Sequence, residues 1–236
     1  MTPVLELVGI SKDYRGLRPL RIASLTIAAG EQVAILGLDQ LSAEIFVNLA
    51  TGATLPDAGE VRVLGRLTSA ITDSADWLAT VDRFGIVSER AVLLEQLTVV
   101  QNLAMPFTLD IEPPPDDIRA RAERLAGEAG LLPRSWTTPV ADLDPIDRVR
   151  VRLGRAMALD PAVLLLEHVS ASVGRGQVAA LAADMRDIAR RRGAALVAAT
   201  ADETFARAVA GRVLSLELSS GRLTERRARW FGGRAG

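Results

Sequence analysis

The stretch Val33–Gly52 constrains the fold more than any other part of the sequence. It consists of an apolar run, a glycine at position 37, a short polar loop and a helical pattern that ends at a second glycine. This is the layout of a phosphate-binding strand, loop and helix, in which backbone N–H groups converge on a phosphate. Such a loop also uses a lysine for the phosphates and a Ser or Thr hydroxyl for Mg²⁺. Ala43 and Glu44 occupy those two positions here, so the stretch predicts an α/β unit without the phosphate-binding side chains.

The composition indicates a core built mainly from aliphatic side chains. Of the 236 residues, 49% are hydrophobic and 4% are aromatic, which is typical of α/β proteins with buried parallel strands. The formal net charge of −1 gives no reason to expect binding to nucleic acid or to an anionic membrane. The absence of cysteine excludes disulfides and thiolate metal sites. Lys12 is the only lysine and His168 the only histidine, so mechanisms that need either side chain have one residue available.

Apolar patterns predict strands at both ends of the chain and helices between them. The predicted strands are Val4–Lys12, Ile22–Ala28, Glu31–Leu36, Val61–Leu64, Arg83–Ser88, Ala162–Glu167, Ala194–Thr200 and Arg212–Leu218. The predicted helices are Ser42–Thr51, Asp116–Ala129, Gly176–Arg192 and Glu203–Val209, and a hairpin turn is predicted at Ser219–Arg222. The order of these elements indicates antiparallel β structure that leads into a buried central strand, and alternating strands and helices in the C-terminal part.

The same pattern predicts one domain with an inserted part. Residues 1–91 and 158–222 form the predicted α/β core with its β subdomain, and residues 92–157 form a helical subdomain with apolar residues at three- and four-residue spacing. Residues 223–236 are predicted to be a tail, in which arginines accompany Trp230 and Phe231. Such an end is either solvated or used for docking.

No segment approaches 18 uninterrupted apolar residues, and the first residues lack the basic and apolar regions of a signal peptide. From these observations we expect a soluble, cytoplasmic protein.

Several stretches together resemble the nucleotide-binding subunit of ATP-binding cassette (ABC) transporters over nearly the whole chain. Leu143–Pro161 is similar to the family's signature loop and the helix after it, and Ala162–Val173 is similar to its Walker B strand. Gly85–Pro106 resembles the Q-loop region of lipoprotein-release and macrolide-export cassettes, and Tyr14 falls where the family has an aromatic residue on adenine. The resemblance implies a P-loop NTPase-like (RecA-like) core with an N-terminal antiparallel β subdomain and an inserted helical subdomain.

The resemblance also assigns site positions, most of which carry the wrong side chains for ATP. The implied nucleotide site comprises Tyr14, Gly37, Asp39, Gln40, Ser42, Ala43 and Glu44, and the signature loop comprises Asp144, Pro145, Ile146 and Asp147. The implied catalytic positions hold Glu89 for the Q-loop glutamine, Glu167 for the magnesium-linked aspartate, His168 for the glutamate that polarises water, and Ala201 for the switch histidine. Gly174 replaces the D-loop aspartate.

These departures weaken every contact that phosphoryl transfer needs. Gln40 and Ser42 replace glycines whose permissive backbone lets the loop wrap a phosphate, while Asp39 and Glu44 place carboxylates beside it. Two like charges about 4 Å apart repel by roughly 4 kcal/mol at the effective dielectric of a protein surface. Because positioning and electrostatics supply nearly all of this catalysis, we expect no ATP hydrolysis, no bound metal and no cofactor.

Some of the single residues also have structural interpretations. Tyr14 either stacks on a base or packs as an amphipathic side chain, and His168 is interpreted as a hydrogen-bonded structural residue rather than a base. Glu89 and Glu167 either share a cation or, as is more common for acidic pairs, are solvated or paired with arginines. The arginines of the stretch Arg148–Arg155 are interpreted as a solvated or salt-bridged helix face, with nucleic-acid binding less favoured.

The resemblance implies a membrane permease as partner. The expected contact residues are Leu93, Leu94, Leu97, Thr98 and Asn102, and the expected location is the cytoplasmic face of the inner membrane. We therefore predict a non-hydrolysing structural or regulatory subunit that also forms a homodimer or a heterodimer with another cassette. Two alternatives stay open: an ATP-binding or ATP-hydrolysing subunit with unusual site chemistry, and a soluble scaffold or regulator without a permease.

Overall fold

The computed structural model describes residues 3–225, and its N-terminal part is an antiparallel sheet. The strand order in this sheet is β2-β1-β4-β5. Its strands are β1 (Pro3–Lys12), β2 (Leu20–Ala28), β4 (Ala58–Val63) and β5 (Arg66–Leu67). The predicted antiparallel β structure at the start of the chain is thus confirmed.

A second sheet of six strands forms the centre of the molecule, in the order β10-β9-β3-β8-β7-β6. All neighbouring strands from β9 to β6 are parallel, and only β10 is antiparallel to its neighbour. The strands are β3 (Gln32–Leu36), β6 (Phe84–Val87), β7 (Val163–Glu167), β8 (Ala195–Thr200), β9 (Arg212–Glu217) and β10 (Arg222–Glu225). Every residue of β3, β7 and β8 is buried, which explains why these strands read as continuous apolar runs.

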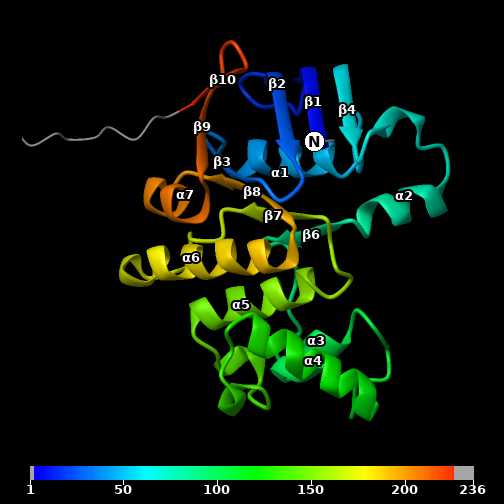
Figure 1. Cartoon of the computed structure of the whole chain (residues 1–236), viewed down its shortest axis with the longest axis vertical. Helices are drawn as coiled ribbons and strands as arrows, with labels where there is room; N and C mark the ends of the chain where they lie inside the picture. Colours follow the sequence, from blue (N-terminus) through cyan, green and yellow to red (C-terminus); the bar gives the residue numbers. More distant parts are fainter. Residues whose placement is uncertain (1–2, 226–236) are drawn as a thin grey trace, which may run out of the picture.

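Helices cover both faces of this sheet and form one end of the molecule (Figure 1). Those beside the sheet are α1 (Gln40–Ala50), α6 (Arg175–Arg192) and α7 (Glu203–Val209), whereas α2 (Ser74–Val81) lies at the right-hand edge of Figure 1. The helical end contains α3 (Val99–Ala104), α4 (Asp116–Glu128) and α5 (Pro145–Ala156). Single 3₁₀ turns lie at Thr68–Ala70, Pro133–Ser135 and Val140–Asp142.

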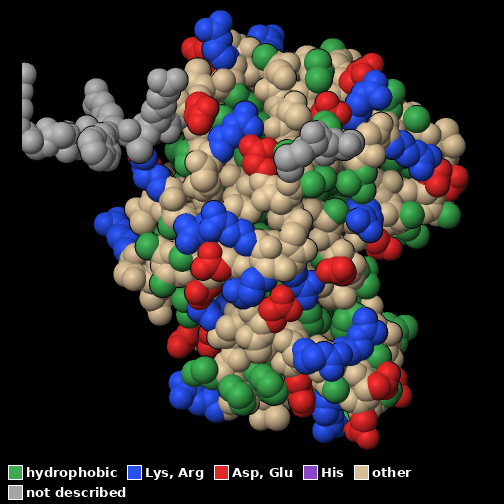
Figure 2. Space-filling model, viewed as in Figure 1, with side chains coloured by type: hydrophobic (Ala, Val, Ile, Leu, Met, Phe, Trp, Pro, Cys, Tyr) green, Lys and Arg blue, Asp and Glu red, His purple; other side chains and the backbone are tan. Residues whose placement is uncertain are grey.

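The core divides into two apolar clusters on opposite faces of the six-stranded sheet. One cluster joins the sheet to α6, α7 and the helical end, and the other joins it to α1 and the antiparallel sheet. Arg192, near the end of α6, makes two hydrogen bonds to Glu128 at the end of α4, of 2.6 and 2.7 Å. Outside this core, acidic and basic side chains are interspersed over the face shown in Figure 2.

The predicted elements are present, with ends shifted by a few residues, but α2 is an element that sequence patterns missed. None of its residues is buried, so it lacks the apolar periodicity that marks a helix packed on a core. Its visible signal is Asp73, whose side chain caps the helix by accepting a hydrogen bond from the Asp76 N–H.

The C-terminal boundary of the core also differs from the prediction. Residues 223–225 belong to β10, which pairs with β9, so the segment predicted as a tail begins within the sheet. The rest of that segment, with Trp230 and Phe231, lies outside the described residues. Between β6 and β7 all elements are helical, and the division into core and helical subdomain stays a prediction. None of the helices among residues 3–225 has the length and apolar composition needed to cross a membrane.

Candidate nucleotide-type site

The candidate site lies at one edge of the six-stranded sheet, where parallel strands end together. The register pairs Leu36 at the end of β3 with Thr200 at the end of β8, and Glu167 at the end of β7 with Ala199. The loops after β3, β6, β7 and β8 therefore leave the sheet on the same side, which is the usual place for ligand sites in such folds.

The loop after β3 does not form an open phosphate cradle. Helix α1 begins at Gln40, not at the predicted Ser42, because Asp39 caps it. The Asp39 carboxylate accepts hydrogen bonds from the Ser42 N–H at 2.7 Å and from the Ser42 hydroxyl at 2.6 Å. The chain's own carboxylate thus occupies the helix N-terminus at which a phosphate would otherwise be favoured.

Other residues of the loop, and the first turn of α1, pack against the rest of the protein. Gly37 has a φ of +100°, and a Cβ atom there would lie 2.7 Å from the Leu216 carbonyl oxygen, so its glycine is required by the close approach of β9. Ala43, at the lysine position of the resemblance, is 0% exposed within the core. The only lysine, Lys12, pairs with Asp57 at 2.8 Å. The loop residues present therefore do not fit a magnesium-bound polyphosphate.

Arg90 supplies the positive charge at this site. Its guanidinium donates to both carboxylate oxygens of Glu167, at 3.1 and 2.6 Å, and lies 3.2 Å from the Glu44 carboxylate. Gln40 donates a further hydrogen bond of 3.0 Å to Glu167. The Glu167 side chain is 0% exposed, whereas those of Arg90 and Glu44 are 38% and 35% exposed. The alternative that Glu167 pairs with an arginine is thus confirmed.

Hydrogen bonding shifts the pKa values of two groups around this cluster. The hydrogen bond to Glu167 raises the pKa of the Arg90 guanidinium above its ordinary value. The hydrogen bonds from Ser42 lower the pKa of Asp39, and the nearby His168 acts in the same direction. Both groups are therefore held in their charged forms.

We expect that Asp39→Ala lowers the free energy of unfolding by about 1 kcal/mol at neutral pH, because an N-cap acceptor is lost. Asp39→Asn should cost less, since its amide oxygen still accepts from Ser42. Because the folded-state pKa of Asp39 is lowered, its contribution is present above the unfolded value of about 3.9 and is lost as pH falls through the folded value. Urea unfolding at neutral and acidic pH would test this; equal acid sensitivity of wild type and Asp39→Asn would contradict it.

Tyr14 and His168 flank the same loop. Tyr14 is half-buried. Burial raises the pKa of its hydroxyl, and the charge of Asp39 adds to the effect. His168 has a φ of +46°, and its Nε2 atom is buried without a hydrogen-bond partner. The prediction of a hydrogen-bonded histidine is therefore wrong for Nε2, because no polar atom of residues 3–225 lies within hydrogen-bond reach of it.

The signature-like residues lie away from this cluster. Asp144 and Pro145 begin α5, which lies on the far side of the sheet and α6 from α1 in Figure 1. Burial raises the pKa of Asp147. Glu89 and Pro145 line one hollow of about 520 Å³, together with Leu143, Arg148, Arg152 and Ser172. Ala201 follows β8 and is exposed, Gly174 precedes α6, and Ile146 is half-buried.

The predicted permease contact lies in Leu93–Pro106, and residues 88–98, which lead into and overlap this stretch, are held in place by Asn102. Asn102 is 0% exposed; its Oδ1 accepts from the Leu94 N–H at 2.9 Å, and its Nδ2 donates to the carbonyls of Leu94, Leu97 and Thr98 at 3.0 to 3.2 Å. Leu93 is also buried. The prediction is therefore wrong for Asn102 and Leu93 as direct contacts, because they shape the segment instead. Leu94 remains 41% exposed, while Thr98 caps α3.

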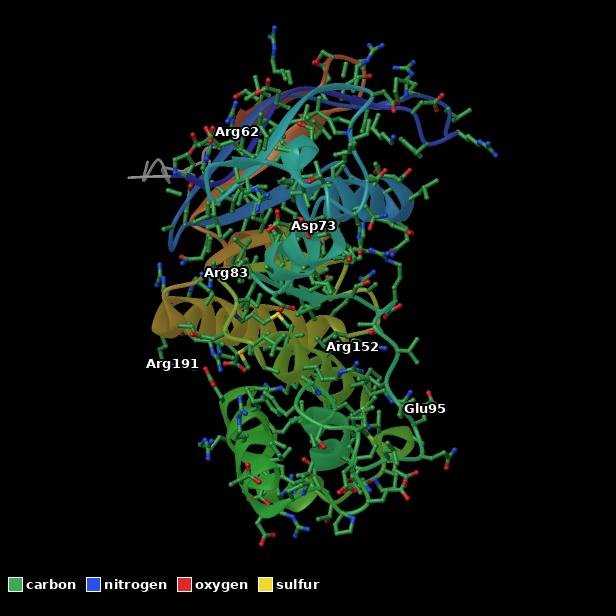
Figure 3. The ribbon with its side chains drawn as sticks, turned by 90° about the vertical axis from the view of Figure 1, so that its right-hand side faces the viewer. Arg62, Asp73, Arg83, Glu95, Arg152 and Arg191 are labelled. Carbon is green, nitrogen blue, oxygen red and sulfur yellow. The ribbon has the colours of Figure 1, made fainter. Side chains whose placement is uncertain are left out.

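Arginines of α5 hold the same segment from the other side. Arg152 donates to the Ala91 carbonyl at 3.2 Å, and Arg155 donates to the Val92 carbonyl at 2.6 Å. Burial lowers the pKa of both guanidiniums. These two arginines thus fasten a loop, where a solvated or salt-bridged helix face was predicted. Figure 3 shows Arg152 where the strand-containing part of the molecule meets the helical end.

A groove of about 380 Å³ adjoins this segment. Its walls are mainly apolar, with the two arginines at the side, and they comprise Phe84, Ile86, Ala91, Met105, Pro106, Arg152, Arg155, Ala156 and Leu159. Val92 and Leu159 are exposed by 71% and 52%. The groove therefore offers an apolar surface between the sheet and the helical end.

Arg90 is the site residue that sequence reasoning missed. Its neighbour Glu89 carries the family resemblance, and Arg90 has no motif of its own. The available signal was the excess of acidic residues at the aligned positions, namely Asp39, Glu44 and Glu167, which calls for a cation from an arginine-rich chain. Only the tertiary arrangement shows which arginine supplies it.

No protein-family model matches the chain. It is 33% identical over 207 residues to the lipoprotein-releasing system ATP-binding protein LolD of Maricaulis maris, covering 86% of this chain and 90% of that protein. It is 27% identical over 227 residues to the methionine import ATP-binding protein MetN of Mesorhizobium japonicum, covering 96% of this chain. The chain spans only 61% of that MetN protein.

Solved structures show the same fold. The chain superposes on cbiO1 of Clostridium perfringens, described as part of the ABC transporter complex cbiONQ, with a TM-score of 0.80, 18% identity, and coverage of 95% of this chain and 88% of that chain. It superposes on the dimeric ATP-binding cassette MJ0796 bound to ADP and Pi with a TM-score of 0.75, 21% identity, and coverage of 94% and 99%. The predicted P-loop NTPase-like fold is confirmed by these likenesses.

Proposed function

The chain belongs to the family of ATP-binding subunits of ABC transporters, and from that premise we propose that it is a catalytically degenerate member. In this role it neither binds nor hydrolyses ATP and serves as a structural or regulatory subunit. It docks on a membrane permease from the cytoplasmic face and pairs with a second cassette, either its own copy or another chain.

The observation that carries this proposal is the Asp39 cap on α1. Phosphate binding at a helix N-terminus relies on free N–H groups and a favourable dipole, and the Asp39 carboxylate takes a hydrogen bond from the Ser42 N–H in that place. A bound phosphate would have to displace this carboxylate or lie beside its charge. Ala43 and Glu44 offer neither the lysine nor the hydroxyl that an active loop uses.

The experiment is calorimetry of the purified full chain with Mg-ATP. The expected result is no binding heat, while the LolD protein of Maricaulis maris, run in parallel as an intact relative, binds. Micromolar Mg-ATP binding that disappears in Tyr14→Ala would overturn the proposal and favour a residual ATP-binding subunit with unusual site chemistry.

Docking is supported by the groove beside residues 88–98. Its walls are apolar, and Arg155 has a guanidinium pKa lowered by burial, with its hydrogen bond going to the Val92 carbonyl. A short amphipathic helix of a permease that brings one carboxylate to this arginine suits both features. The exposed Leu94 and Val92 lie in the same segment.

A pulldown from detergent extract tests the docking role against the scaffold alternative. We expect an integral membrane protein to co-purify with the wild type and to be lost with Leu94→Glu, because a charge would then face the apolar partner surface. Leu17→Glu is the matched control, since Leu17 is fully exposed in the loop between β1 and β2. Capture that is unchanged by Leu94→Glu would contradict this docking surface, and absence of any membrane protein would favour the soluble scaffold.

A further inference from the structure

The cluster around Arg90 connects the residues that follow β6 to helix α1 and to the end of β7. Arg90 follows β6, and its guanidinium contacts Glu44 of α1 and Glu167 at the end of β7. The Arg90 N–H donates to the Ser88 hydroxyl at 3.1 Å, which keeps the turn after β6 tight. The guanidinium thus bridges the core to the start of residues 88–98.

The same segment is held on its other side by α5. The carbonyls of Ala91 and Val92, directly after Arg90, accept hydrogen bonds from Arg152 and Arg155. Residues 90–92 therefore connect the sheet edge to the helical end, through the Arg90 side chain on one side and the carbonyls of Ala91 and Val92 on the other. Without the Arg90 contacts the segment would still be held by α5, by Asn102 and by the backbone hydrogen bonds that Glu95 and Leu97 accept from Ala141 and Val140.

We infer that Arg90 is a positioning residue that sets residues 88–92 permanently against the core, so that the docking segment takes its shape without any nucleotide or metal ion. The statement that this segment docks on a permease rests on the proposed function, whereas the contacts of Arg90 with Glu44 and Glu167 do not depend on it. The guanidinium lies between Glu44 and Glu167 and balances their charges, and it is covalently part of the segment that it positions. A bound ligand dissociates when its concentration falls, whereas the Arg90 guanidinium is part of the chain and cannot dissociate from it.

Bidentate geometry makes arginine the residue suited to this role. The Nε and Nη2 atoms donate to the two oxygens of Glu167, while Nη1 faces Glu44. A lysine ammonium is a single charged point and cannot keep the paired contact to Glu167 while also reaching Glu44. Arg90→Lys should therefore preserve charge but loosen the segment.

The test is amide hydrogen exchange of the full chain, followed in a peptide covering residues 88–98, with and without Mg-ATP. The wild type should be protected equally in both conditions. Arg90→Met should accelerate exchange at the amides of Arg90 and Ala91 by about tenfold or more, because their opening is no longer opposed by the ion cluster. Arg90→Lys should lie between the two, and Arg62→Met, which removes an exposed pair with Glu60, should match the wild type.

A second variant separates positioning from general stability. In Arg90→Met/Glu167→Gln the buried carboxylate charge is gone, so the melting temperature should recover, yet exchange in residues 88–92 should remain fast. Equal protection of this segment in the wild type and in the double variant would overturn the inference, as would slower exchange of the wild type on addition of Mg-ATP. Failure of the proposed function would show separately, as Mg-ATP binding heat or as no effect of Leu94→Glu on capture.

Discussion

Replacing Arg90 by methionine is expected to lower the free energy of unfolding by about 3 kcal/mol, because a buried carboxylate loses its counter-charge. The Glu167 side chain is 0% exposed, and without Arg90 it keeps only the hydrogen bond from Gln40. Methionine preserves much of the length and apolar contact of the arginine stem, so the loss reports chiefly on the ion cluster. Urea unfolding followed by circular dichroism measures the change.

Two comparisons make this result specific. Arg90→Met/Glu167→Gln should recover most of the lost stability, since no uncompensated charge is then buried. Arg207→Met, which removes an exposed pair with Glu203 on α7, should change stability by no more than about 0.5 kcal/mol. An Arg90→Met variant as stable as the Arg207→Met control would show that Glu167 does not depend on the guanidinium.

Ala43→Lys is expected to destabilise the protein by about 3 kcal/mol without conferring Mg-ATP binding. Ala43 is 0% exposed and belongs to the same buried cluster as Phe46 and Val47, so a longer, charged side chain must displace neighbours or leave the core. The Asp39 cap and the pairing of Glu44 with Arg90 remain in this variant and still oppose a polyphosphate. Urea unfolding and calorimetry with Mg-ATP on the same preparation give both readouts.

The matched control is Ala180→Lys, which makes the same substitution on the exposed face of α6. It should leave stability within about 0.5 kcal/mol of the wild type. If Ala43→Lys bound Mg-ATP and kept its stability, the loop would be a working phosphate site that lacks one side chain, and the degenerate reading of the whole site would fail.

Much of the fold could be predicted from the sequence because its signals are local. The buried strands β3, β7 and β8 are short continuous apolar runs, and α7 was predicted with the bounds that the structure has, Glu203–Val209. Helix α2 was missed because it buries no side chain and so carries no periodic pattern. The start of α1 was misplaced because the hydrogen bond from the Ser42 N–H to Asp39, and not apolar spacing, decides where it begins.

For the candidate site, too, some features could be predicted from the sequence and others could not. Residue types alone gave Ala43 and Glu44 at the positions where the resemblance implies a lysine and a hydroxyl. Sequence spacing could not show that Asn102 and Leu93 are buried, because burial depends on contacts between distant elements.

The sequence by itself determined the buried strands, most of the helices, the family resemblance and the side chains present at the positions of a phosphate-binding loop, all of which are local properties of residues and their spacing. Only the tertiary structure decided what replaces the missing cation. Arg90 lies 46 positions after Glu44 and 77 before Glu167, and the parallel sheet brings the three together by ending β6 and β7 side by side next to α1. A long-range ion cluster of this kind is set by the meeting of distant elements, which no pattern along the chain records.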